Sequence, residues 1–363
     1  MHAADLRVHI RQLCCLGVPG EQLMPRLLKA VRRLVGADSA GFFWVDARGD
    51  MTALYAERLL PAPVMQVYFE RYYDAAESSF RSAFAQRARG AQPVIAESAT
   101  PSAERTEYYN EVLRHLDAHH VLYGIVREQG QTLGQLSLYR PKSAPAFSAN
   151  DEAALATVMR YVAHGVSRRT HEALPAQALT EAAEDAIFVV DATGTVGPLS
   201  PAAHKLLALA VQGGLGPGRG PALADAARPL LARLREQLAH ALAGADIEPP
   251  GCAVDNAWGR FVLRAYALAE DPEARDGPMA VRIARQEPMI LKFVDALAGL
   301  GLTPQQREIA AGLARGASNQ ELAEALGVSA NTIAYHIKQL FARLDTHDRQ
   351  RMVGRVLDGR PSA

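Results

Sequence analysis

Near the C-terminus, two helix starts lie so close together that they fix the path of the chain between them. Ser318-Asn-Gln-Glu321 is a capping box, in which the serine hydroxyl and the glutamate carboxylate each accept a backbone N–H group. The helix that begins there is expected to end at Gly327, and Ser329 can cap the next helix. Only residues 327–329 then separate the two. So short a turn predicts a sharp crossing, which is the helix-turn-helix arrangement.

The helix predicted after Ser329 has one apolar and one polar face. At roughly 100° per residue, its core face consists of Ile333, Ile337, Leu340 and Leu344. The opposite face carries Asn331, Tyr335, Lys338 and Ala342, and one flank carries Thr332, His336, Gln339 and Arg343. Asparagine and lysine can contact base edges in the major groove, and threonine, glutamine and arginine suit phosphate oxygens. The polar face is therefore interpreted as a surface that reads double-stranded DNA.

Local charge agrees with this interpretation. The whole chain has a formal net charge of zero, so any attraction to nucleic acid must be local. Residues 329–357 carry five basic and two acidic side chains, whereas residues 303–328 carry two basic and three acidic ones. The positive end is the end that should face a duplex. Two simpler alternatives remain open: a helical bundle that binds only proteins, and a His336 that only packs within the bundle.

Residues 302–349 resemble the LuxR-type output domain. The specific pieces are Ser318-Asn319 with Glu321-Leu322-Ala323, and Ser329-x-x-Thr332-Ile333-x-x-His336. The resemblance implies a four-helix domain that reads DNA with its third helix and often dimerises through its fourth, here 347–357 with Met352, Val353, Val356 and Leu357. The residues expected to contact DNA are Ser318, Asn319, Ser329, Asn331, Thr332, Ala334, Tyr335, His336, Lys338, Gln339, Arg343 and Arg349.

Three positions depart from the family pattern. Ala334 stands where a basic residue is usual, and Gln306 stands where glutamate is usual. Gly312 lies inside the first predicted helix of this unit, where glycine costs about 1 kcal/mol relative to alanine. A basic side chain at position 334 would add a contact, so its loss predicts a weaker dependence of DNA binding on salt.

The pattern of the N-terminal half predicts, in order, a helix, a hairpin, further helices, a second hairpin and a final helix. Residues 1–35 are expected to be helical, and "SAGFFWVD" and "MTALYAE" predict two strands joined by a tight turn. A helix is expected at 104–116, and "HHVLYGIVREQGQTLGQLSLYRP" predicts a second hairpin before the helix in "FSANDEAALATVMRYVAHGV". This order predicts one antiparallel sheet with helices against it. The pattern resembles a GAF-type sensory domain.

A second unit follows a linker at about 170–178. "DAIFVVDATGTVGPLS" predicts a strand, a turn and a short strand, and the opening resembles the start of a PAS domain. A Gly/Pro-rich loop is expected at 213–221, followed by a helix interrupted near Pro229. The expected fold class is α+β, with two antiparallel-sheet sensory-type domains before an all-α four-helix domain. The expected boundaries are 1–170 (GAF-like), 176–287 (PAS-like), 288–300 (helical linker) and 301–363 (helix-turn-helix).

The aromatic residues of the first unit could line a ligand pocket or could be core. The candidates for a pocket are Phe42, Trp44, Tyr55, Tyr68, Tyr72 and Tyr123. His115, His119 and His120 are interpreted as a solvated helix end and a strand start, because no cysteine or carboxylate is spaced to complete a metal site. No metal or cofactor is expected. The sequence shows no phosphate-binding loop, nucleotide-binding glycine pattern or nucleophile elbow, so no enzymatic activity is expected.

Composition limits the remaining classes. Three cysteines, an adjacent pair and a distant single, form neither a disulfide framework nor a metal spacing, which fits a reducing compartment. Charges interrupt the N-terminus and no apolar run reaches the ~18 residues of a spanning helix, so a cytoplasmic protein without membrane attachment is expected. The sequence predicts a DNA-binding transcription regulator, a homodimer whose N-terminal domains sense a small molecule or set dimerisation. The alternatives are a constitutive dimer that binds no ligand, and an enzyme within 1–287.

Overall fold

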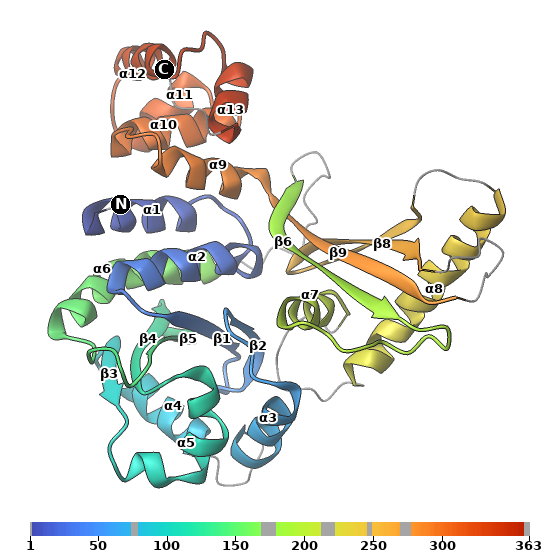
Figure 1. The fold of residues 1–363 in the computed structure, drawn as a ribbon. Helices are drawn as coiled ribbons and strands as arrows, with labels where there is room; N and C mark the ends of the chain where they lie inside the picture. Colours follow the sequence, from blue (N-terminus) through green and yellow to red (C-terminus); the bar gives the residue numbers. More distant parts are fainter. Residues whose placement is uncertain are drawn as a thin grey trace.

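The computed structural model describes residues 2–73, 79–167, 179–211, 222–244, 249–268 and 277–358. The chain forms three units: an N-terminal α/β unit, a second sheet with helices to one side of it, and a C-terminal group of helices above the first (Figure 1). The linker expected at about 170–178 and the Gly/Pro-rich loop at 213–221 lie outside the described residues. The mixed α+β fold class is confirmed.

A five-stranded antiparallel sheet organises the first unit. Its strands are β1 (Ser39–Val45), β2 (Met51–Ala56), β3 (Val94–Ser98), β4 (His120–Glu128) and β5 (Gln131–Arg140). They lie in the order β2-β1-β5-β4-β3. Both predicted hairpins are present, because β1 pairs with β2 and β4 pairs with β5. The two hairpins meet at β1 and β5, where Gly41 lies opposite Ser137.

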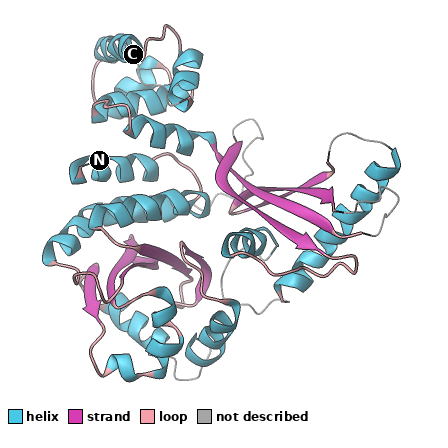
Figure 2. Ribbon diagram, in the orientation of Figure 1, coloured by secondary structure: helices cyan, strands magenta, loops and turns pink. Residues whose placement is uncertain are grey.

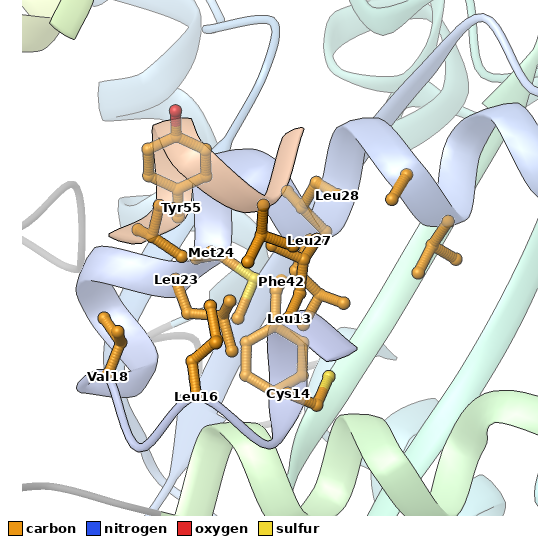
Figure 3. Packing of buried hydrophobic residues seen from close by; sticks show 14 of the residues in the cluster. Leu13, Cys14, Leu16, Val18, Leu23, Met24, Leu27, Leu28, Phe42 and Tyr55 are labelled. Carbon is orange, nitrogen blue, oxygen red and sulfur yellow. The ribbon is translucent and has the colours of Figure 1, made fainter. Parts of the chain in front are cut away.

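Helices cover both faces of this sheet (Figure 1). On one side lie α1 (Ala3–Cys14), α2 (Gly20–Val35) and α6 (Ala149–Ser167); on the other lie α3 (Ala62–Val67), a π-helix (Tyr68–Tyr73), α4 (Ser79–Arg89) and α5 (Glu107–Glu111). Leu23, Met24, Leu27 and Leu28 of α2 are buried beside Phe42 of β1 (Figure 3). This apolar layer fixes α2 against the sheet.

Two predicted helices differ from the structure. Residues 1–35 form two helices, because Gly17 adopts a left-handed backbone (φ 76°) and Pro19 follows, which ends α1 and begins α2. The helix expected at 104–116 is divided into a 3₁₀ turn (Ala103–Arg105), α5 and a second 3₁₀ turn (Leu113–Leu116). Both differences leave the layers of the domain as expected.

The second unit is a four-stranded antiparallel sheet. Its strands are β6 (Leu179–Val190), β7 (Gly251–Asn256), β8 (Gly259–Ala267) and β9 (Met279–Pro288), in the order β6-β9-β8-β7. The helices α7 (Pro201–Val211) and α8 (Leu223–Gly244) pack on one face, over buried Phe188, Phe261 and Val281. The predicted interruption near Pro229 is wrong, since α8 continues through this proline although it has no N–H group to donate within the helix.

The C-terminal unit is entirely helical (Figure 2). Its helices are α9 (Met289–Ala298), α10 (Pro304–Ala314), α11 (Asn319–Leu326), α12 (Ala330–Arg343) and α13 (Arg349–Leu357). The helix α9 continues from β9 and contacts α1, α10 and α13. None of the helices within the described ranges is long and apolar enough to span a membrane.

Candidate nucleic-acid interface and ligand pocket

Side-chain caps begin α10, α11 and α12, as the sequence predicts. In α10, the hydroxyl of Thr303 accepts the N–H of Gln306 at 3.2 Å, and the Gln306 side chain accepts the N–H of Thr303 at 3.0 Å. Ser318 and Glu321 form the same reciprocal pair at α11. Ser329 accepts the N–H of Thr332 at 3.1 Å at α12. These caps set where each helix begins, and therefore which side chains α12 presents.

The turn between α11 and α12 depends on Gly327, which ends α11 with a left-handed backbone (φ 64°). A second glycine permits the helices to pack. A Cβ atom on Gly312 of α10 would lie 2.3 Å from Cδ2 of Leu322, which is buried on α11. Gly312 lowers the helix propensity of α10, but it leaves the room that the Leu322 side chain of α11 occupies.

The faces of α12 separate as the helical wheel predicts. Ile333 and Leu340 are fully buried against α10 and α11, whereas Asn331, Ala334 and Lys338 are exposed. Tyr335 is 59% exposed, which is unusual for so large an apolar ring. Its hydroxyl accepts a hydrogen bond from Nε2 of Gln339 at 2.7 Å. The outward face therefore presents an amide, a phenol and an ammonium group in a row.

The flanking residues are held more firmly. The hydroxyl of Thr332 lies 2.9 Å from that of Ser329, and the ring of His336 is half-buried against Tyr335. Arg343 donates to the carbonyl of Gly301, and Arg349 donates to the carbonyl of Ala317, each at 2.9 Å. These bonds orient the two guanidinium groups beside α12. Ser318 and Asn319, at the start of α11, are exposed.

The apolar side of α13 is used inside the chain. Met352 and Val356 are fully buried, and α13 packs on α9 and α10. Val353 and Leu357 are partly buried against the same core. A dimer made through these four residues, as the resemblance implies for the fourth helix, would have to displace α9.

The N-terminal unit holds a pocket of about 350 Å³ between its sheet and the layer formed by α3, α4 and α5. The floor includes Ser39 and Gly41 of β1, Gln135 and Ser137 of β5, and Tyr123 of β4. The opposite wall includes Met65, Tyr68, Arg87, Tyr108 and Val112. The lining as a whole is mainly apolar with a few polar groups, which is the usual character of a small-molecule site.

Two family models match the chain. The model of bacterial regulatory proteins of the luxR family matches residues 300–356, and the GAF domain model matches residues 19–166. This chain carries a LuxR-type helix-turn-helix domain and a GAF domain. Both predicted resemblances are confirmed, and the combination indicates a DNA-binding regulator of transcription with a GAF sensory domain. The resemblance of residues 176–287 to a PAS domain stays a prediction.

Two solved structures show a distant similarity to this chain. The chain is similar to GAF3 of Slr1393 from Synechocystis sp. PCC6803 in its photoproduct state, at 17% identity over 39% of this chain and 87% of that one, with a TM-score of 0.30. It is also similar to the sensor region of a sensor histidine kinase, at 15% identity over 71% of this chain and 91% of that one, with a TM-score of 0.19. None of the curated proteins matches.

A set of ion pairs joins the GAF domain to the LuxR-type domain through α1. Asp5 pairs with Arg307 of α10 at 3.3 Å, and the Arg307 side chain is only 3% exposed. Arg11 pairs with Glu308, and Nε2 of Gln12 donates to the carbonyl of Pro304 at 3.3 Å. The opposite face of α1 is buried against α2 and α6. The helix α1 therefore lies between the two domains and contacts both.

Arg26 of α2 connects all three units. Its Nε donates to Glu287 at the end of β9 at 2.8 Å, and its Nη1 pairs with Asp295 of α9. Asp295 also lies 3.0 Å from Nε2 of His9 on α1. Burial acts to raise the pKa of Asp295, but the hydrogen bond to His9 and the charge of Arg26 outweigh it, so this pKa is lowered. We call Arg26, Glu287, Asp295 and His9 the joint.

Of the six predicted ligand-contacting aromatics, Tyr68 and Tyr123 line the GAF pocket. Phe42 borders the pocket, but its ring lies on the other face of the sheet, 4.6 Å from the ring of Trp44. Tyr72 instead donates its hydroxyl to Glu111 at 2.6 Å. Trp44 and Tyr55 lie outside the pocket, because side chains alternate along a strand and these two share the other face of the sheet. There they pack on Trp258 of the second unit, with ring centroids 5.7 Å apart in both pairs.

A buried polar group accompanies this aromatic contact. The hydroxyl of Tyr55 lies 2.6 Å from Nζ of Lys205 on α7, and Lys205 pairs with Glu184 of β6 at 3.3 Å. Arg285, which is 2% exposed, lies 3.6 Å from the same carboxylate. Burial lowers the pKa of Lys205, although the charge of Glu184 acts in the opposite direction. These contacts fix the second unit against the GAF domain.

Sequence reasoning missed the polar residues of the pocket, among them Arg87, Gln135 and Ser137. Residues 135, 137 and 139 alternate along β5 and so share one face, and this was a signal that could have been used. Buried polar residues facing a core are uncommon and call for partners. Arg87 had no comparable signal, because its place depends on how α4 packs on the sheet.

The histidines at 115, 119 and 120 are spread over different contacts. His115 is exposed, whereas Nδ1 of His119 lies 3.2 Å from Glu104 and Nδ1 of His120 lies 2.7 Å from the hydroxyl of Ser98. Within the described ranges, no group of three or more His, Cys, Asp and Glu side chains could hold a metal ion.

Proposed function

We propose that this protein is a cytoplasmic, sequence-specific regulator of transcription that reads duplex DNA with α12. The observation that carries the proposal is the exposed row of Asn331, Tyr335 and Lys338 on the second helix of a capped helix-turn-helix. In this assignment Asn331 and Lys338 contact base edges and Tyr335 contacts a thymine methyl or a phosphate. A helix of this kind enters the major groove with such a face.

The remaining residues of the proposed interface contact the phosphates of the DNA backbone. Thr332, Gln339 and Arg343 lie on the flank, and Arg349 projects from the start of α13. Ser318, Asn319 and Ser329 stand at helix N-termini, where backbone N–H groups favour phosphate oxygens. His336 either packs within the helical bundle or contacts a phosphate. At Ala334 the chain presents a methyl group, so this protein holds its site with fewer ionic contacts at that position.

We propose that the GAF domain is the sensor and that its pocket takes a small molecule. The pocket lies on the far side of the sheet from α1, α2 and α6, and the LuxR-type domain rests on those helices. A ligand that alters the sheet or α2 can alter Arg26, which holds both α9 and the end of β9. The domain boundaries 1–170, 176–287, 288–300 and 301–363 are part of this proposal.

The mechanism we propose is a shift between two arrangements of the joint. Ligand binding favours one arrangement only if the ligand binds it more tightly than the other. Two LuxR-type domains placed by that arrangement would match the spacing of two half-sites on DNA. In a constitutive dimer that binds no ligand, the joint would have one arrangement and DNA affinity would not change.

We propose that the active form is a homodimer. Four large apolar side chains are exposed on or beside the uncovered face of the second sheet: Ile187 (65%), Val189 (44%), Tyr266 (39%) and Leu268 (48%). Apolar side chains gathered in this way are typical of a protein–protein interface. Sedimentation equilibrium measures the oligomeric state of the full chain and of an Ile187→Lys variant, which should dimerise less. A full chain that is monomeric at micromolar concentration would contradict the homodimer.

Genome-wide mapping of bound DNA in the source cells tests the proposed function. The full chain should occupy a limited set of promoter regions that share a sequence motif, and a Lys338→Ala chain expressed at the same level should lose them. Occupancy that follows neither a motif nor Lys338 would show that α12 does not read DNA.

A further inference from the structure

The GAF pocket exists because the residues in the middle of its floor are small. Gly41 of β1 lies opposite Ala56 on one side and opposite Ser137 on the other, and Ser39 is two residues away on the same face. Their neighbours in the lining, such as Phe43 and Tyr123, are large. The backbone does not require glycine at position 41, because a Cβ there would meet its nearest atom at 3.5 Å. The space at Gly41 is therefore open to a side chain or to a ligand.

Polar groups gather at one end of this space. Nε of Arg87 donates to Oε1 of Gln135 at 3.1 Å, and Nε2 of Gln135 lies 3.2 Å from the hydroxyl of Ser137. The guanidinium of Arg87 also stacks on the ring of Tyr123, 4.0 Å from its centroid. Gln135 is 1% exposed and Ser137 is 5% exposed. A buried polar row thus lies beside a pocket that is otherwise apolar.

The charge at this end is incompletely balanced. The Arg87 side chain is 10% exposed, and its carboxylate partner Glu97 lies 3.5 Å away and is 49% exposed. The other lining cation, Arg58, pairs with Asp117 outside the pocket. A distant and solvated carboxylate screens a nearly buried guanidinium weakly, and an arginine fork matches a carboxylate best through two parallel hydrogen bonds.

Most of the remaining lining is apolar and includes Met51, Leu54, Leu60, Met65 and Val112. Tyr108 and Tyr123 keep their hydroxyls protonated as donors, because burial raises the pKa of each. The lining also holds two guanidinium groups, those of Arg58 and Arg87, against one carboxylate, that of Glu97. A ligand that fits would bring acceptor oxygens to the polar end and a hydrocarbon or aromatic body to the apolar part of the lining.

We infer that the GAF pocket binds a small apolar organic acid, with its carboxylate on Arg87 and Ser137 and its apolar body over Gly41. The carboxylate would take the place beside Arg87 that Glu97 fills only at a distance. This inference rests on the proposed sensory role of the pocket, but binding of the acid is measurable without DNA.

Three acids, each with its primary amide, test the inference on the full chain by titration calorimetry: 4-phenylbutyrate, octanoate and indole-3-acetate. At least one acid should bind, and should bind at least tenfold more tightly than its amide, because only the acid pairs with Arg87. Arg87→Gln should abolish this preference. Arg89→Gln, an exposed arginine on the same helix, should leave it unchanged.

Gly41→Leu supplies a variant that does not depend on Arg87. It fills the space over the floor with little strain, so it should abolish binding of acid and amide alike while the melting temperature stays close to that of the original chain. Equal binding of acid and amide, acid binding that survives Gly41→Leu, or no binding by any of the three acids would overturn the inference.

The same titrations separate this inference from the proposed function. If an acid binds through Arg87 but DNA affinity does not change, the ligand class stands and the sensory mechanism fails. If no acid binds while DNA binding still depends on Lys338, the ligand class alone fails.

Discussion

The reading face of α12 and the pocket of the GAF domain are built in opposite ways. On α12 the side chains of Asn331, Tyr335 and Lys338 project outward, and these side chains themselves form the site. In the pocket, Ser39, Gly41 and Ser137 have small side chains or none, and the site is the space that they leave. A projecting face suits the groove of a stiff polymer, and a closed space suits a small molecule. The face of α12 does not suit a small molecule, and the pocket does not suit DNA. A signal from the pocket can therefore reach α12 only through a third element, the joint.

The largest effect should come from breaking the joint. Arg26→Ala leaves Glu287, whose side chain is 7% exposed, and Asp295 without their shared cation. Because one partner of a largely buried pair is removed, we expect a loss of about 2–3 kcal/mol in the free energy of unfolding, measured in urea. Hydrogen exchange should rise in α9. Arg33→Ala removes an exposed arginine from the same helix and should cost less than about 0.5 kcal/mol. Equal losses in both variants would mean that the joint does not hold the domains.

Lys338→Ala should weaken specific DNA binding without affecting the pocket. A base contact of this kind is worth about 1–3 kcal/mol, or roughly a tenfold to hundredfold rise in Kd. Lys292→Ala removes an exposed lysine from α9, outside the reading face, and serves as the matched control in fluorescence anisotropy. If the two variants bind DNA alike, Lys338 is not in the interface.

Ala334→Lys should strengthen binding by restoring a charge to the reading face. One added phosphate contact should steepen the slope of log K against log salt by roughly 0.9. Ala156→Lys places the same charge on an exposed position of α6 in the GAF domain, and its slope should stay near that of the original chain. A slope that is unchanged in Ala334→Lys would place position 334 away from the phosphates.

The smallest effect should be a loss of folding stability at low pH. Because the pKa of Asp295 is lowered in the folded chain, its contribution to stability is complete above the ordinary value of 3.8 and is lost as the pH falls below it. The midpoint of urea unfolding should fall more steeply between pH 5 and pH 3 in the original chain than in Asp295→Asn, which lacks this carboxylate. Parallel curves would show that Asp295 is not stabilised as a charged group.

The two sites also differ in how far they follow from the sequence. Ser318, Gly327 and Ser329 act within one or two turns, so the ends of α11 and α12 and the exposed face of α12 could be predicted from short segments. The role of Gly312 could not, because it depends on Leu322 of the next helix. The apolar residues of α13 were visible, but their burial under α9 depends on packing between units.

The pocket needed information that no short segment holds. Gly41 faces it only because β1 pairs with both β2 and β5, and those pairings bring residues 41, 56 and 137 together. Of the predicted aromatics, Trp44 and Tyr55 are as apolar as Tyr68, and strand alternation alone decides which face they take. The ion pairs of α1 and Arg26 span more than 250 residues of sequence, so nothing local could indicate them.

Selection of bound duplexes from a random DNA pool with the full chain tests the central claim most directly. The account predicts that a single motif is enriched, with two half-sites related by a two-fold axis, and that Lys338→Ala shifts or abolishes the preference at one position in each half. Enrichment of no motif by the original chain, or of the same motif by Lys338→Ala with unchanged affinity, would contradict the claim that α12 reads DNA.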